Sequence, residues 1–135
     1  MEDFIKLLSG YANEAFRLET LPVYDVSQER DTFDFFLKTG EIRQNDNLID
    51  YIQEHAEKIE LGKKHIRARV VPSPITDYFL YETKCGYIPQ SNAGFYHYFL
   101  DYDTYKQKFT SINDFWLFDE ETVVYMKYDG TGEFL

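Results

Sequence analysis

The hydrophobic pattern changes its period at Gly62, and this change limits the possible folds more than any other feature of the chain. Before Gly62, apolar residues recur at steps of three and four, as they do on amphipathic helices. After it, apolar and polar residues alternate, as they do in half-buried strands. Helices followed by strands are typical of an α+β domain. We therefore expect a helical N-terminal half packed on a mainly antiparallel sheet formed by the C-terminal half, in one domain spanning residues 1–135.

Four helices are predicted from apolar stripes and their capping residues. The first covers residues 4–15, and the second covers residues 27–40, with a serine to cap its start and a glycine at its end. The third spans residues 45–62, and it carries a strongly apolar side. A short fourth helix is expected over residues 75–84, after a Pro that suits a first helical turn, and we expect Gly86 to end it.

Strands are predicted mainly in the second half. Residues 16–19 alternate in polarity but stand alone among helices, so they indicate a helix exit or a short extended segment. Residues 65–71 alternate as a half-buried strand does, with one apolar and one basic face. The run 95–102 is aromatic on both faces, which is typical of a central strand. Segments 115–118 and 122–128 flank an acidic turn and predict a hairpin.

The chain is acidic and rich in tyrosine, and both properties bear on its partners. A formal charge of −10 repels a phosphate backbone, so direct binding of nucleic acid is excluded. The same charge would suit a protein that imitates nucleic acid in the groove of another protein. Twelve tyrosines favour a protein-binding surface, because tyrosine is enriched at interfaces, although each alone is typical of the edge of a core.

The location is predicted from cysteine usage and from the N-terminus. A single cysteine, Cys85, excludes an intramolecular disulfide, and the first residues carry no secretory pattern. Apolar runs are too short to span a membrane. We therefore expect a cytoplasmic protein, and the sequence does not determine its oligomeric state.

One set of charged residues could form a binding site. Arg67 and Arg69 share a face of the predicted strand about 7 Å apart, where they could clamp a carboxylate or phosphate. The alternative is that they form internal ion pairs with acidic residues of the same domain. The full set is Arg17, Glu19, Arg67, Arg69, Asp77 and Glu82.

Other residue types give weaker indications. Three scattered histidines do not match a metal-binding motif, and no cofactor motif is present, so we expect neither a metal nor a cofactor. The acidic residues at positions 101, 103 and 119–121 do not fit a calcium loop. Trp116 is predicted in the core, and a partly exposed Trp116 would instead anchor a protein partner.

Several segments resemble an uncharacterised bacterial family of unknown function. The resemblance lies in residues 16–19, Tyr24, residues 67–71 with Pro74, then Asp77, Tyr78 and Glu82, and finally residues 114–119. It implies occurrence in actinomycetes, often beside genes of helix-turn-helix regulators, and no known activity. Members generally continue past the position of Leu135 through a further strand and a closing helix, so this chain is expected to be shorter than its relatives. Together with the charged set, the resemblance gives ten candidates for contact with a ligand or partner: Arg17, Glu19, Tyr24, Arg67, Arg69, Asp77, Tyr78, Glu82, Trp116 and Asp119.

Three functions are compatible with these observations. The first is a non-enzymatic regulatory or adaptor protein that binds another protein, either a regulator or a nuclease. The second is an acidic inhibitor that imitates nucleic acid and blocks a defence nuclease, as anti-CRISPR and anti-restriction proteins do. The third is a small enzyme acting on a phosphorylated or carboxylated ligand held by Arg67 and Arg69. Because no catalytic motif is present, we favour the first.

Overall fold

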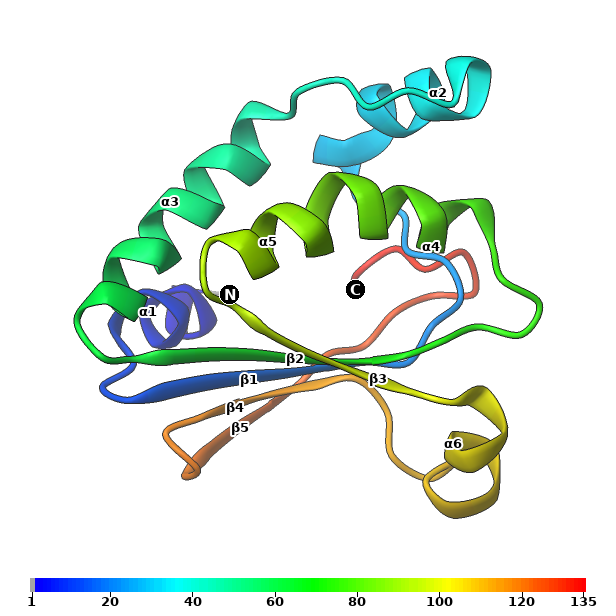
Figure 1. Ribbon diagram of the computed structural model, residues 1–135. Coiled ribbons are helices and arrows are strands. Elements are labelled where there is room, and N and C mark those ends of the chain that lie inside the picture. The colour runs from blue at the N-terminus through cyan, green and yellow to red at the C-terminus, as the bar shows by residue number, and fades with distance from the viewer. Residues whose placement is uncertain (1) are drawn as a thin grey trace.

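A computed structural model describes residues 2–135 and shows a five-stranded sheet with most of its helices on one face (Figure 1). The strands are β1 (Glu14–Glu19), β2 (Lys64–Val70), β3 (Tyr96–Leu100), β4 (Phe115–Phe118) and β5 (Thr122–Tyr125). The helices are α1 (Glu2–Gly10), a 3₁₀ turn η1 (Ser27–Glu29), α2 (Arg30–Thr39), α3 (Asp46–Glu60), α4 (Asp77–Glu82), a π-helical turn η2 (Thr83–Tyr87), α5 (Ile88–Asn92) and α6 (Tyr102–Lys108). Among these residues, no helix is both long and apolar enough to cross a bilayer.

The sheet is mixed, with strand order β3-β2-β1-β4-β5. Strands β1, β2 and β3 run parallel to one another, whereas β4 and β5 are antiparallel to their neighbours. The predicted α+β class is confirmed. The predicted division into a helical N-terminal half and an antiparallel C-terminal sheet is wrong, because β1 from the N-terminal half is the middle strand. Its charged residues Arg17 and Glu19 face the helices, so β1 lacks the apolar pattern of a central strand.

Two local predictions also need correction. The aromatic run 95–102 was expected to be a central strand, but β3 is an edge strand with exposed Tyr96 and Tyr98. Gly86 does not end the fourth helix, since α4 continues through the π-helical turn η2 into α5. Gly86 does not adopt the positive φ of a helix-ending glycine, and the first glycine after it that does so is Gly94, which follows α5. The second and third helices, the strand after Gly62 and the hairpin are confirmed. The first helix ends at Gly10 and not at residue 15, because Glu14 and Ala15 pair with β2 as part of β1.

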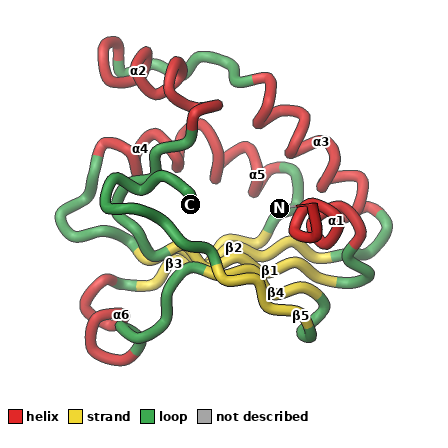
Figure 2. The backbone as a smooth tube through the Cα atoms, turned by 180° about the vertical axis from the view of Figure 1, so that it is seen from behind, coloured by secondary structure: helices red, strands yellow, loops and turns green. Residues whose placement is uncertain are grey.

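The helices α1 to α5 and the C-terminal segment lie on one side of the sheet, and α6 lies on the other side beyond β3 (Figures 1 and 2). Two apolar clusters fill the helical side. One joins α1 to Trp116 and Phe118 of β4, and the other joins α2 to Tyr78 and Tyr81 of α4. Polar and charged side chains of β1 and β2 lie between these clusters.

The opposite side of the sheet, which we call the outer face, is apolar across all five strands, except where Glu14 and Lys64 lie side by side at the start of β1 and β2. Its central residues are half-buried, whereas Tyr98 on β3 and Tyr125 on β5 are 60% and 73% exposed. Strand register aligns its side chains in two rows, and neither row contains a charge. The rows are Tyr96, Ile66, Phe16, Leu117 and Val123, and Tyr98, Ala68, Leu18, Phe115 and Tyr125.

Candidate functional site

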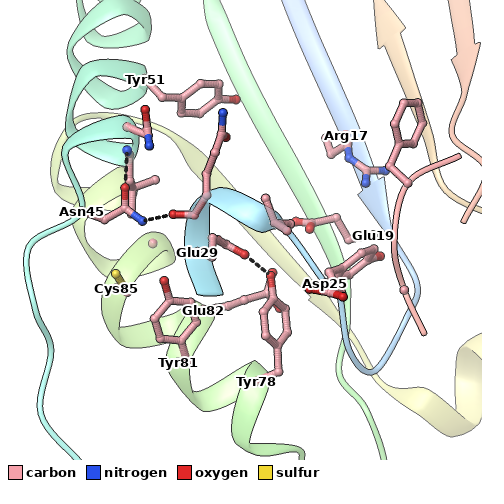
Figure 3. A pocket seen from close by; sticks show the side chains of 18 of the residues that line it. Arg17, Glu19, Asp25, Glu29, Asn45, Tyr51, Tyr78, Tyr81, Glu82 and Cys85 are labelled. Atoms are coloured by element: carbon pink, nitrogen blue, oxygen red, sulfur yellow. Dashed lines mark hydrogen bonds between the residues drawn. The ribbon is translucent and has the colours of Figure 1, made fainter. Parts of the chain in front are cut away.

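A pocket of about 630 Å³ lies between the sheet and the helices (Figure 3). Strands β1 and β2 contribute its charged floor, and helices α3, α4 and α5 with the turn η2 form its walls. The segment 24–29 and the C-terminal residues 132–134 border it as well. Its volume falls within the range of about 300–1,000 Å³ that is usual for small-molecule sites.

The floor of the pocket is charged because alternate residues of β1 and β2 point to the helical side. Parallel register pairs Arg17 with Arg67 and Glu19 with Arg69. Side chains two residues apart on a strand share a face. The sheet therefore places three guanidinium groups and one carboxylate together, although Arg17 and Arg67 are fifty residues apart in the chain.

Each of the three arginines is paired with a carboxylate. Guanidinium nitrogens lie 3.2 Å from Asp114 for Arg17, 3.1 Å from Glu19 for Arg67, and 2.9 Å from Glu82 for Arg69. The side chains in these pairs are at most 13% exposed. Removal of one partner would leave an uncompensated buried charge, which is strongly unfavourable. The pairs therefore contribute to the fold as well as to the pocket.

Asp114 is an essential member of this network that the sequence did not single out as a candidate. It immediately precedes β4 and is 2% exposed. Its carboxylate accepts hydrogen bonds from Arg17, from the Tyr24 hydroxyl, and from both the backbone N–H and the hydroxyl of Thr20. Asp114 begins the segment 114–119 that carries the family resemblance, and that resemblance was the signal that could have marked it as a candidate.

A tyrosine hydroxyl joins two of the ion pairs. Tyr87 Oη lies 3.1 Å from Glu19 Oε1 and 3.0 Å from Glu82 Oε2. A hydroxyl has a single proton, so both contacts are hydrogen bonds only when one carboxyl is protonated. Burial and, in addition, repulsion from the negative charge of Glu19 raise the pKa of Glu82 to about 8. Burial also disfavours ionised Glu19, but Arg67 and Arg17 outweigh this effect and lower its pKa.

These pKa shifts indicate which of the two carboxyl groups, Glu19 or Glu82, is protonated at neutral pH. Protonated Glu82 donates to the oxygen of Tyr87, and Tyr87 donates in turn to ionised Glu19. The two carboxyl groups thus differ in charge although both are buried. A pair of acids with pKa values driven apart in this way is common in functional sites.

Glu29 also lines the pocket, and the environment of its carboxyl group differs from those of Glu19 and Glu82. In residues 2–135 it forms no ion pair, and its side chain makes a single hydrogen bond, from the Tyr78 hydroxyl at 2.6 Å (Figure 3). Neighbouring Arg30 pairs instead with Asp25 on the surface. Burial raises the pKa of Glu29 against the effect of the Tyr78 hydrogen bond, and the negative charge of Glu19 raises it further.

Hydrogen bonds link the pocket to the buried His65, whose ring packs against that of a second buried histidine, His55. Tyr51 Oη accepts from Arg67 and lies 2.7 Å from His65 Nε2. His65 Nδ1 and His55 Nε2 lack partners among the described residues. Burial, with the charge of Arg67, lowers the pKa of His65, and burial lowers that of His55 to about 4. Both histidines are neutral at physiological pH.

Seven of the ten candidate residues meet in this pocket, and three lie elsewhere. Arg69 is fully buried behind the lining, and Asp77 is exposed in the first turn of α4. Asp119 accepts hydrogen bonds from the backbone N–H groups of residues 12–14 and thus closes the turn before β1. The seven residues that line the pocket are Arg17, Glu19, Tyr24, Arg67, Tyr78, Glu82 and Trp116.

The remaining acidic residues do not form one continuous surface. Asp101 and Asp103 lie at α6, whereas residues 119–121 form the turn between β4 and β5 at the opposite end of the sheet (Figure 1). Within the part of the chain that the structure describes, no three His, Cys, Asp or Glu side chains are placed to hold a metal ion. The pocket is thus the place where polar, charged and aromatic side chains converge.

The chain belongs to the family described as a domain of unknown function (DUF6879), whose model matches residues 2–135. This membership agrees with the resemblance to an uncharacterised family, which the residue pattern had indicated. No curated protein matches the chain, and no solved structure matches it.

Proposed function

We propose that this member of the DUF6879 family is a cytoplasmic, non-enzymatic regulatory protein that binds a small molecule in the pocket. One observation carries the proposal: side chains from three strands, five helical segments and the loops beside them converge on a single space of about 630 Å³. Tight packing is the rule in protein interiors, so an open space lined by charged groups needs a reason. The tyrosine-rich walls would bury the body of a ligand, and the polar floor would orient it.

A pocket-filling substitution tests this proposal. A Cβ atom at Gly86 would meet Gln90 Nε2 at 3.9 Å, an ordinary contact, and both residues line the pocket. We expect Gly86→Leu to fold and to occupy part of the pocket. Gly10→Leu is the matched control, because a Cβ atom at Gly10 faces open space at the end of α1.

The measurement is the melting temperature of the three proteins against a metabolite library that spans cationic, neutral and anionic compounds. A ligand at a hundredfold excess over its Kd stabilises the native state by about 2.7 kcal/mol, which raises the melting temperature by several degrees. We expect such shifts with the wild type and Gly10→Leu and their loss with Gly86→Leu. Shifts that persist in Gly86→Leu would locate the ligand elsewhere, and the absence of any shift would refute the proposal.

A second candidate function is protein binding by the outer face. Ten aligned side chains without charge cover this side of the sheet, and Tyr96, Tyr98 and Tyr125 are more than half exposed. Exposed apolar patches of this kind often mark interfaces. Because the chain carries a charge of −10, a partner with an apolar contact surface and a basic rim is favoured over a second copy. A helix-turn-helix regulator encoded beside the gene, which the family resemblance implies, is the first partner to test.

Sedimentation of the purified chain with that regulator tests this second function. We expect a complex that weakens at high salt and is abolished by Tyr98→Asp, whereas Gly86→Leu leaves it intact. Self-association of the chain alone, abolished by the same Tyr98→Asp variant, would assign the outer face to a homodimer instead. A complex that survives Tyr98→Asp would place the interface on another surface.

A further inference from the structure

We propose that the ligand of the pocket is a small organic cation, a primary amine or related compound, whose charged group binds at the carboxyl group of Glu29. This inference rests on the proposed function of the pocket and adds the chemical class of its ligand. It follows from which charges inside the pocket are already compensated and from which hydrogen-bonding groups are already engaged.

Glu29 is the one carboxyl group in the lining of the pocket that has no basic side chain beside it in the described part of the chain. Glu19 and Glu82 lie beside Arg67 and Arg69, whereas Asp25 and Glu133 lie beside Arg30. A buried carboxylate without a counter-charge is costly, and burial raises the pKa of Glu29 in the empty pocket. A ligand with one positive charge would supply the missing cation and allow Glu29 to ionise.

The position of Glu29 makes it accessible to such a ligand. It lies in the 3₁₀ turn η1, and its side chain projects into the middle of the pocket beside Tyr78 (Figure 3). The Tyr78 hydroxyl occupies Oε1, which leaves Oε2 without a protein donor. An ammonium group has three donors and would hydrogen-bond this oxygen directly.

The aromatic walls suit an organic cation. Tyr24, Tyr78 and Tyr81 line the pocket around Glu29, and successive ring centroids are 6.1 Å and 5.9 Å apart. Aromatic rings attract cations through their faces and bury alkyl or aryl groups through their area. A carboxylate surrounded by such rings therefore recognises both the charge and the apolar body of an amine.

An anionic ligand fits this pocket less well. The terminal nitrogens of Arg17 bond to the Leu18 carbonyl, Asp114 and Tyr128, and those of Arg67 bond to Glu19 and Tyr51. Arg67 Nε is buried without a partner among the described residues, but a phosphate or carboxylate that bound Arg67 bidentately would also compete with Glu19 or Tyr51 for a terminal nitrogen. The two-arginine clamp expected from sequence is thus already occupied by side chains of the protein itself. A metal ion is disfavoured because the described residues offer no group of three suitable ligands.

Binding of a cation to Glu29 is expected to release a proton. Burial raises the pKa of Glu29 in the empty pocket, and a nearby positive charge would lower it again. The amine would therefore bind more tightly as the pH rises, because Glu29 has to lose a proton in a smaller fraction of the molecules. A neutral ligand in the same pocket would show no such dependence.

Calorimetry with three compounds of similar shape tests the inference: tyramine as the cation, 4-ethylphenol as its neutral analogue and 4-hydroxyphenylacetate as the anion. We expect tyramine to bind most tightly and to release protons, which is measured by comparing buffers with different ionisation enthalpies. In Glu29→Gln, which keeps the shape and the hydrogen bond from Tyr78, tyramine affinity should fall roughly tenfold or more. Asp34→Asn, an exposed residue of α2, is the control for the same change in net charge.

The possible outcomes separate this inference from the proposed function. If the anion or the neutral compound binds as well as tyramine, or if Glu29→Gln leaves tyramine affinity unchanged, the ligand class is wrong while the pocket remains a ligand site. If the three compounds all fail to bind the wild type and the wider library also gives no shift, both proposals are wrong. If Glu29→Gln melts at a lower temperature, the proton release measured with the wild type still decides the question.

Discussion

Replacement of Arg69 by methionine is expected to destabilise the protein by an amount that depends on pH. Arg69 is fully buried, donates to Glu82 at 2.9 Å and to the Val70 carbonyl, and packs over the rings of Tyr24 and Phe79. Methionine retains much of the apolar stem but removes the charge and the hydrogen bonds. The loss of one partner from a buried ion pair costs about 3–5 kcal/mol. This is a large part of the 5–15 kcal/mol typical of a whole domain.

The pH dependence follows from the protonation of Glu82. Its folded pKa of about 8 lies above its ordinary value, so the folded state holds this proton over a pH range in which the unfolded state has lost it. Stability therefore falls as the pH rises through that window. Removal of Arg69 raises the pKa of Glu82 further and extends the window to higher pH. At pH 5.5 Glu82 is neutral in both proteins, so we expect a loss of about 1–3 kcal/mol there. At pH 8.5 the wild-type Glu82 has begun to ionise beside Arg69, so we expect the loss to be larger by about 0.8 kcal/mol.

Urea denaturation monitored by the fluorescence of Trp116 provides the assay. Trp116 is the single tryptophan and is 5% exposed, so its emission reports unfolding. Glu82→Gln imitates the protonated acid, and in that background the effect of Arg69→Met should be independent of pH. An equal loss at pH 5.5 and pH 8.5 in the otherwise wild-type protein would show that Glu82 is ionised throughout, and the assignment of the proton to Glu82 would fail.

Three further predictions concern other parts of the fold, and each is measured by denaturation. Asp114→Ala removes the acceptor of Arg17 and is expected to cost about 3–5 kcal/mol, so a loss below 1 kcal/mol would contradict a buried ion pair. Backbone hydrogen bonds lower the pKa of Asp119, so ionised Asp119 stabilises the protein at neutral pH and this stabilisation is lost as the pH falls. In Asp119→Asn the free energy of unfolding should therefore depend less on pH in the acid range. Gly132→Ala should cost about 1–3 kcal/mol, because its φ is +89° and a Cβ atom would approach a backbone oxygen to 2.4 Å, whereas Gly130→Ala meets open space and should be neutral.

Local periodicity was sufficient to predict the elements whose residues decide their own conformation. The helix of residues 45–62 was predicted because its apolar residues repeat at helical steps, and Asn45 caps the observed α3 by accepting from Leu48. Strand β2 and the β4–β5 hairpin were predicted from alternation and turn composition. In these segments the side-chain pattern and the backbone hydrogen bonds are set within a few residues.

The position of a strand within the sheet could not be predicted in this way. β1 was expected to be at most a short extended segment, yet it pairs with both β2 and β4. Its inward side chains are charged, so their burial becomes favourable only when partners from other elements arrive. The aromatic β3 was expected in the centre and lies at the edge, since hydrophobicity alone does not determine which strands find two neighbours.

The sequence by itself determined the α+β class, the helices with clear apolar stripes and the acidic charge. It also indicated a set of charged residues, among them Arg17, Glu19 and Arg67, as candidates for a binding site. The tertiary structure decided that seven of ten candidates meet in one pocket, that Asp114 and Glu29 belong with them, and which carboxyl has no cation. The physical reason is the distance along the chain over which each kind of interaction acts. Periodicity and capping act over a few residues, whereas a buried charge is stabilised or left uncompensated by groups as far along the chain as Arg17 is from Asp114.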